Sequence, residues 1–370
     1  MNAGIAALGK VVDCTILSTS FPGPLKHEIL RDSVLNGIED YFASDIVLVT
    51  LEGRQDVGKT RVVSQFAQRH NNSCVSLFVR PNSWFLQDPA LVLSDLANQM
   101  HWALRHFELP STTDIDEATV RHLSFELQRT GRATGQIFYF AIDGLDELVE
   151  ESSLLCSTLA SVLPLEYSSF RFLITGECGW LPNGGRLARK AYPISGFTIE
   201  ETVAYLGQQS ATRVQAEELY RNCSMGRPGY LASAKRLLDS GMTADKLLEN
   251  LPEQLPNPFD IEWEKTDFTP EAIRLALGIL CFDSTPHSLS ELSALVSTDA
   301  EVLRSELERF GFVDVGTEGF PVSYVTTSYR RFASDKLTPI REAVWERLVT
   351  HFLEDRESER ALEVLPTYLE

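Results

Sequence analysis

One eight-residue stretch constrains the fold of this chain more than any other feature. It reads Gly53-Arg-Gln-Asp-Val-Gly-Lys-Thr60, between an apolar, β-branched run at 45–51 and a stretch with helical spacing at 60–70. Its glycines allow a tight turn with inward-facing N–H groups, and the helix that follows directs its positive dipole end to the same point. The stretch therefore predicts a strand, a phosphate-binding loop and a helix, in that order.

The residues of this loop have separate expected roles. Lys59 is expected to reach the β- and γ-phosphates of a nucleotide, and the hydroxyl of Thr60 to bind Mg²⁺. ATP or ADP with Mg²⁺ is thus the expected ligand. The residues predicted to contact the nucleotide here are Gly53, Arg54, Asp56, Val57, Gly58, Lys59, Thr60 and Arg61.

A second motif, Phe138-Tyr-Phe-Ala-Ile-Asp-Gly-Leu-Asp-Glu147, is a hydrophobic strand that ends in carboxylates. Asp143 falls at the strand's carboxyl end, where we expect it to bind Mg²⁺ directly or through water. Asp146 and Glu147 are the candidate catalytic residues, since either carboxylate can orient or deprotonate an attacking water. The competing structural interpretation is an acidic helix start, because Asp and Glu suit helix N-termini.

Strands and helices alternate through the first half of the chain. This alternation predicts a three-layer α/β domain with a mainly parallel sheet at residues 21–195. The expected strands are 45–51, 74–79, 137–142, 170–175 and 191–194, and the expected helices 60–70, 89–105, 117–128 and 154–163, with Asp88 as an N-cap.

The second half reads as helical. After an N-terminal segment, 1–20, and the core, 21–195, we expect a helical lid at 196–250 and a proline-containing linker at 251–265. Three helices and a small hairpin predict a winged helix at 266–338. A helical arm at 339–370 fits the start of a C-terminal sensor array.

Charge and cysteine usage exclude several classes of function. The net charge is −19, so nucleic acid is disfavoured as a partner. The six cysteines are scattered, which predicts neither a zinc site nor disulfides and fits reduced thiols in the cytoplasm. No apolar run is long enough to span a membrane.

These motifs together resemble the NACHT-type branch of the STAND signalling ATPases, relatives of the AAA+ fold. The resemblance rests on the acidic motif Ile142-Asp-Gly-Leu-Asp-Glu147, the stretch 193–206 and Gly226-Arg-Pro228. It implies an adenine contact at Pro228, an ADP-bound closed state, and self-association when ATP replaces ADP. It also implies ATP hydrolysis, a protein trigger, a protein effector, and a role in innate immunity or defence against phage. The departure at Glu177, described next, makes slow hydrolysis the expectation.

Two positions depart from that family. Glu177 stands where many relatives place an arginine facing the γ-phosphate, and Mg²⁺ or Arg171 would have to compensate for its charge. Thr326 stands where relatives often carry a histidine that touches ADP, with Arg330 or Arg331 as substitutes or as surface residues of a helix.

Two further interpretations therefore stay open. One is a nucleotide-locked scaffold that never hydrolyses ATP, since a missing cation slows phosphoryl transfer. The other is a AAA+ ATPase with a winged helix that acts on DNA. The second is disfavoured because the candidate recognition helix, 299–310, carries four acids and two arginines.

Overall fold

A computed structural model of the chain describes most of its residues in two units. The first unit comprises Met1–Arg54 and Gly58–Ser195, and the second Gln55–Val57 and Gly196–Glu370. The described residues are 18, 20–23, 28–54, 56–79, 88–110, 115–145, 153–176, 181, 187–207, 210–249, 258–264, 270–283, 285–315, 321–354, 361–362 and 365.

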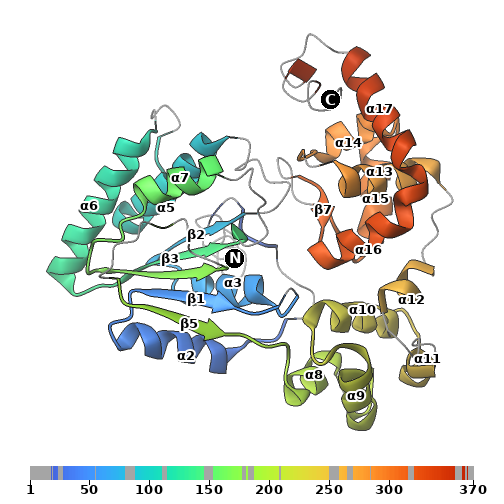
Figure 1. Ribbon diagram of the computed structural model, residues 1–370, viewed down its shortest axis with the longest axis horizontal. Coiled ribbons are helices and arrows are strands. Elements are labelled where there is room, and N and C mark those ends of the chain that lie inside the picture. The colour runs from blue at the N-terminus through green and yellow to red at the C-terminus, as the bar shows by residue number, and fades with distance from the viewer. Residues whose placement is uncertain are drawn as a thin grey trace, which may run out of the picture. The chain divides into compact units, whose positions relative to one another are not determined.

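The first unit is built on a five-stranded parallel sheet, which confirms the predicted α/β core (Figure 1). Its order is β2-β3-β4-β1-β5, so β4 lies between β1 and β3. The register sets Leu51 opposite Thr175, and Phe78 opposite Asp143. The strands are β1 (Leu48–Glu52), β2 (Cys74–Phe78), β3 (Phe138–Asp143), β4 (Phe170–Thr175) and β5 (Arg189–Pro193).

Helices cover both faces of this sheet (Figure 1). Successive side chains of β3 point to opposite faces of the sheet, and both faces are packed. Phe138 and Phe140 lie in the core under one helical layer. Tyr139 packs edge-on against Phe66 on the other face, with 5.3 Å between the ring centroids. The layer beside Tyr139 contains α2 (Asp32–Ala43) and α3 (Lys59–Arg69), and the opposite layer α5 (Pro89–Arg105), α6 (Glu117–Thr134) and α7 (Ser153–Val162).

Two helices of the first unit differ from the sequence prediction. Helix α2 was not predicted, because Gly37 interrupts its apolar spacing and no side chain caps its start. Helix α6 runs past residue 128 to Thr134 and ends at Gly135 with φ 75°, a left-handed C-cap. The N-cap at Asp88 is confirmed, since its carboxylate accepts a hydrogen bond from Ala90 N.

Side chains protect the edge strand β2. The amide of Gln99 accepts from Ser76 N and donates to Ser76 O, both at 2.8 Å, as a neighbouring strand would. Ser20 Oγ accepts from Phe78 N at 3.0 Å. These bonds satisfy edge groups that would otherwise be free to pair with another chain.

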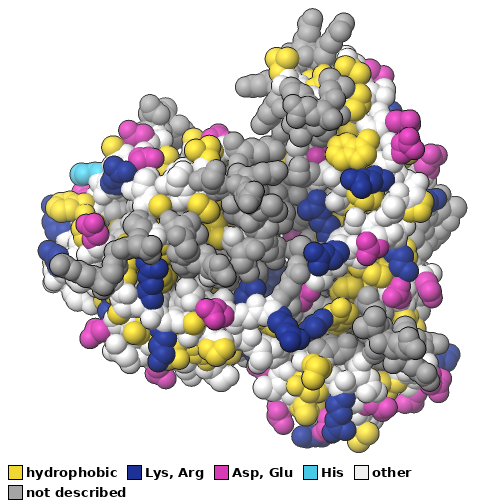
Figure 2. Space-filling model, in the orientation of Figure 1, with side chains coloured by type: hydrophobic (Ala, Val, Ile, Leu, Met, Phe, Trp, Pro, Cys, Tyr) yellow, Lys and Arg dark blue, Asp and Glu magenta, His cyan; other side chains and the backbone are white. Residues whose placement is uncertain are grey.

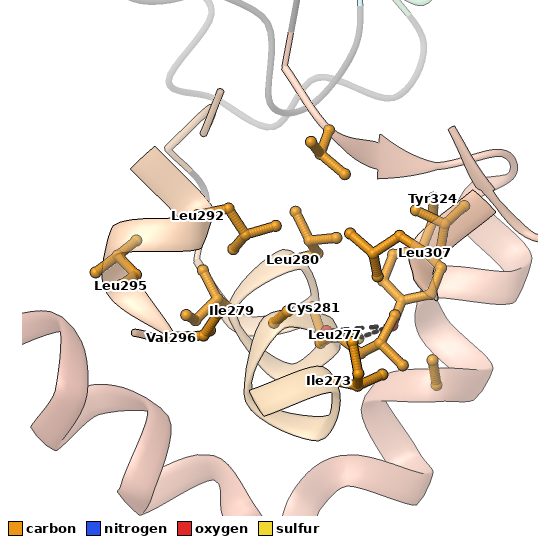
Figure 3. Packing of buried hydrophobic residues seen from close by; sticks show 14 of the residues in the cluster. Ile273, Leu277, Ile279, Leu280, Cys281, Leu292, Leu295, Val296, Leu307 and Tyr324 are labelled. Carbon is orange, nitrogen blue, oxygen red and sulfur yellow. Dashed lines mark hydrogen bonds between the residues drawn. The ribbon is translucent and has the colours of Figure 1, made fainter. Parts of the chain in front are cut away.

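The second unit is helical, with a two-stranded antiparallel sheet, β6 (Val313–Asp314) and β7 (Ser323–Tyr324). Figure 3 shows apolar side chains such as Leu280 and Leu292 gathered in its core. The helices are α8 (Ile199–Leu206), α9 (Arg213–Leu219), the π-helical turn η3 (Tyr220–Ser224), α10 (Pro228–Asp239), α11 (Ala244–Glu249), α12 (Pro258–Glu264), α13 (Glu271–Phe282), α14 (Leu289–Leu295), α15 (Ala300–Glu308), α16 (Thr327–Leu337), the 3₁₀ turn η4 (Thr338–Ile340) and α17 (Arg341–Glu354).

Helix α12 lies inside the stretch 251–265, for which the prolines predict a linker. Pro258 is its first residue, a position where proline costs nothing because the N–H it lacks would be unpaired. The buried ring of Phe259 anchors the helix in the core of the second unit, so this part of the stretch is packed structure. None of the helices that the structure describes combines the length and apolarity required of a membrane span.

A buried charged cluster joins the end of α13 to the start of α14. His287 and Asp283 are each 1% exposed at the side chain, with His287 Nε2 2.6 Å from Asp283 Oδ2. On its other side, His287 Nδ1 lies 3.2 Å from Glu291 Oε2. Arg330 of α16 donates to the backbone oxygen of Asp283 at 2.9 Å. Burial alone would lower the pKa of His287. The interactions with the carboxylates of Asp283 and Glu291 raise it by more than burial lowers it, so the net pKa lies above its usual value of 6.5.

We predict that His287→Gln destabilises the protein by about 3 kcal/mol at pH 6, because the buried carboxylate of Asp283 and the half-buried one of Glu291 lose their cationic partner. A raised pKa in the folded state contributes stability below the unfolded pKa, and this contribution is lost as pH rises through the folded pKa. The difference in free energy of unfolding between the wild type and His287→Gln, measured by urea unfolding, should therefore shrink toward alkaline pH. His122→Gln, at an exposed histidine of α6, is the control. A deficit that grows with pH would contradict the prediction.

Candidate functional site

The loop between β1 and α3 has the geometry expected of a phosphate-binding turn. Gly58, the N-cap of α3, has φ 90° and ψ 26°, a conformation that glycine adopts without strain. No side-chain hydrogen bond caps the start of α3. The first N–H groups of any helix point away from its axis toward the turn that precedes it. Such a helix start is suited to bind an anion.

The basic residues that begin α3 are held by main-chain oxygens. Lys59 Nζ donates to Gly53 O at 3.1 Å, which places the ammonium group across the loop. Thr60 is the second residue of α3 and is half-buried. Arg61 donates to Gly23 O at 2.9 Å and so ties the segment ahead of α2 to α3. The role of Arg61 at a nucleotide stays a prediction.

The other predicted loop residues occupy the turn itself. Gly53 and Arg54 follow β1 and are exposed, Asp56 has a φ of 62°, and Val57 is buried. The turn thus combines one buried residue, Val57, with two exposed ones, Gly53 and Arg54.

Asp143 ends β3 at the same edge of the sheet. Its side chain is almost fully buried, with the residue 2% exposed, and its carbonyl accepts a hydrogen bond from Val79 N at 2.9 Å. Gly144 follows with φ 90°, and a Cβ atom there would lie 1.9 Å from Val79 O. Only glycine therefore fits directly after this carboxylate.

The strand order separates Asp143 from the loop by one strand. Because β4 lies between β1 and β3, Asp143 and the start of the loop are two strand spacings apart, about 10 Å. Thr175 ends the intervening strand and is 0% exposed. Its Oγ1 accepts a hydrogen bond from Gly144 N at 2.9 Å. Thr175 belongs to none of the motifs that predict the site from the sequence.

Several predicted residues lie elsewhere or outside the described residues. Asp146, Glu147 and Glu177 fall outside them. Arg171 is near the start of β4 and donates to Ser168 O and Phe170 O. It is four residues, about 13 Å, from the carboxyl end of the strand. Whether Arg171 compensates for the charge of Glu177 stays a prediction.

In the second unit, Pro228 is the first residue of α10. The preceding turn is held by a close backbone approach, with Phe197 N donating to Gly226 O at 2.6 Å. A Cβ atom at Gly226 would lie 2.1 Å from Phe197 O, and one at Gly196 would lie 2.4 Å from Gly226 O. Two glycines are therefore required to fix the start of α10.

Helix α10 is also bound tightly to α12. Ser233 Oγ donates to Glu262 Oε2 at 2.6 Å, and Arg236 binds both oxygens of the same carboxylate, with Nη2 at 2.8 Å from Oε2. One turn earlier, the ring of Tyr230 stacks on Phe259 at 4.9 Å. Tyr230, Ser233 and Arg236 are spaced by three and so share one face of α10.

Two of the three residues considered for an ADP contact in the second unit, Thr326 and Arg330, have structural partners. Thr326 caps α16, accepting from Tyr329 N at 3.1 Å. Arg330 is half-buried and donates to Cys281 O and Asp283 O at the end of α13, so it is not a surface residue. Arg331 is exposed.

The family model described as Nephrocystin 3, N-terminal, matches residues 36–177. The matched stretch runs from within α2 to just past the end of β4 and includes the loop and Asp143. No curated protein matches this chain.

Several solved structures are similar. A Signal Transduction ATPase with Numerous Domains (STAND) protein with a tetratricopeptide repeat sensor, from Pyrococcus horikoshii, aligns with TM-score 0.53 and 18% identity over 92% of this chain and 47% of that one. The chain thus spans about half the length of that protein. This likeness shows that the chain has the α/β fold of P-loop ATPases.

Two further structures align at lower scores. A Walker-type ATPase of Pyrococcus abyssi has TM-score 0.45 and 13% identity over 83% of this chain and 96% of its own. A RuvB protein of Thermotoga maritima has TM-score 0.34 and 14% identity over 82% of this chain and 95% of its own.

We predict that Lys59→Ala weakens binding of ADP by about 100-fold, because a charge-assisted contact to phosphate is lost from the loop. Isothermal titration calorimetry with Mg²⁺ measures the effect. Lys246→Ala, at an exposed lysine of α11, is the control and should bind as the wild type does. Wild-type affinity in Lys59→Ala would refute the assignment of the loop.

Proposed function

We propose that this chain is the nucleotide-dependent switch of a signalling ATPase. ADP holds the resting state, and ATP produces an active state that self-associates. The acidic motif after β3 and the fold shared with a STAND protein support this proposal. On the same grounds, we assign the switch to innate immunity or defence against phage, with a protein trigger and a protein effector.

The observation that carries the proposal is the set of contacts between α10 and α12, in which Ser233 and Arg236 bind the carboxylate of Glu262. A switch must convert a contact with nucleotide into movement of another part of the protein. The carboxylate of Glu262, 9% exposed as a residue, is bound by Ser233 and by both arms of Arg236. Breaking such a buried pair is costly, so α10 and α12 move together. A base contact at Pro228 would thereby be transmitted along α10 to α12.

The parts after residue 195 have defined roles in this proposal. Helices α8 to α11 form a lid whose position depends on which nucleotide is bound. Helices α13, α14 and α15, followed by the β6–β7 hairpin, form a winged helix that moves with the lid. Helix α12 is the connection between them.

The residues of the first unit fit a nucleotide with Mg²⁺. The uncapped start of α3 and Lys59 suit the phosphates, and Thr60 and Asp143 supply a hydroxyl and a carboxylate, which are oxygen ligands that Mg²⁺ prefers. When bound, Mg²⁺ neutralises charge that develops on the phosphates. Asp146 and Glu147 remain the proposed residues for orienting water.

Charge opposes the alternative of a DNA-acting ATPase. Within the α15 region, Arg304 lies 4.0 Å from Glu301 and 3.8 Å from Glu308, and Arg309 pairs with Glu306 at 2.9 Å. These arginines are therefore paired along their own helix, where carboxylates would repel a phosphate backbone. On the face in Figure 2, basic and acidic side chains are interspersed.

We predict that the mass of the protein in solution depends on the bound nucleotide. Light scattering after size exclusion should give the smallest species with ADP·Mg²⁺ and a multiple of it with a non-hydrolysable ATP analogue, because only the active state exposes the self-associating surfaces. Lys59→Ala should keep the smaller mass in both.

One mass under both nucleotides would contradict the switch and favour the nucleotide-locked scaffold. A mass that responds only to added duplex DNA would favour the DNA-acting ATPase.

A further inference from the structure

The last residue of β4, Thr175, is fully buried and uses its side chain where a strand would use its backbone. The pairing of β3 with β4 ends at Ile142 opposite Ile174. Beyond this pair, Gly144 N has no strand partner and donates instead to Thr175 Oγ1 at 2.9 Å. A buried N–H without an acceptor is costly, so this hydroxyl replaces the missing rung of the ladder.

The same peptide group is held from its other side by Val79, the residue directly after β2. The peptide bond between Asp143 and Gly144 carries the carbonyl of one residue and the N–H of the other. The carbonyl accepts from Val79 N at 2.9 Å, while the N–H donates to Thr175. One planar unit is thus held at both ends, by Val79 directly after β2 and by Thr175 at the end of β4, the two strands that flank β3.

Steric contact adds to these two hydrogen bonds. Gly144 has φ 90° and approaches Val79 so closely that a Cβ would lie 1.9 Å from its carbonyl oxygen. The turn is therefore wedged against Val79 and has no room to shift in that direction. Thr175 closes the opposite side. Fixing this peptide plane fixes ψ of Asp143, and with it the direction of the Cα–Cβ bond that carries the carboxylate.

We propose that Thr175 is a positioning residue for the metal site: its hydroxyl holds the Asp143–Gly144 peptide so that the Asp143 carboxylate is oriented to bind Mg²⁺ with the nucleotide. The metal-binding part rests on the proposed function. Mg²⁺ demands near-ideal octahedral geometry, so a small rotation of its protein ligand weakens binding. Thr175 itself does not touch the metal in this account.

The test compares Thr175→Val, which keeps the shape and removes the acceptor, with Thr175→Ser, which keeps the hydroxyl. Binding of a fluorescent ADP analogue is measured over a Mg²⁺ titration and in EDTA. We expect Thr175→Val to need about tenfold more Mg²⁺ for half-saturation, with affinity in EDTA within about twofold of wild type. Thr175→Ser should match the wild type in both.

Thr158→Val is the matched control. Thr158 is a buried threonine of α7 whose hydroxyl donates to Leu154 O of its own helix at 2.9 Å. Loss of this hydroxyl should leave the Mg²⁺ requirement unchanged. A wild-type Mg²⁺ requirement in Thr175→Val, or an equal defect in Thr175→Ser, would overturn the proposal, since the hydroxyl would then not be the group that acts.

A second readout does not depend on nucleotide. The amide of Gly144, followed by NMR in ¹⁵N-glycine-labelled protein, should exchange with solvent about tenfold faster in Thr175→Val and at the wild-type rate in Thr175→Ser. An unchanged exchange rate in Thr175→Val would contradict the proposal that the Thr175 hydroxyl holds the Asp143–Gly144 peptide. If the wild type binds no ADP, the proposed function fails with the metal-binding part, while the exchange rates still decide whether Thr175 holds the turn.

Discussion

The parallel pairing of β1, β4 and β3 is the constraint on which the candidate site depends. Parallel strands bring their carboxyl ends to one edge of a sheet, so groups that are far apart in sequence meet there. The loop after β1, Thr175 at the end of β4 and Asp143 at the end of β3 share this edge. The hydrogen-bond ladders fix the spacing between them at about 4.8 Å per strand.

In the proposed switch, two glycines and the contact between α10 and α12 would connect this sheet edge to the second unit. Gly58 and Gly144 both have φ 90°, which lets the chain turn at the start of α3 and directly after Asp143. In the second unit, the bonds of Ser233 and Arg236 to Glu262 make α10 and α12 one body. The proposed switch requires both rigid geometry at the phosphate-binding loop and a rigid α10 after the proposed base contact, so that exchange of ADP for ATP would shift a population of states.

The sequence was sufficient for features that local physics determines. The loop 53–60, the buried strands and the cap at Asp88 follow from residue types and spacing. The insertion of β4 between β1 and β3 does not, because strand order is decided by packing. The bond from Gly144 to Thr175 joins residues 31 positions apart, so no local pattern reports it. Helix α12 was missed because prolines at its start resemble those of a linker.

The nucleotide content of the purified protein tests the central claim most directly. The protein is denatured, and the released nucleotides are separated by ion exchange and quantified against protein. A switch held at rest by ADP predicts close to one ADP per chain in the wild type and none in Lys59→Ala. A wild-type protein that releases no nucleotide, or that retains intact ATP for hours, would contradict an ADP-locked resting state.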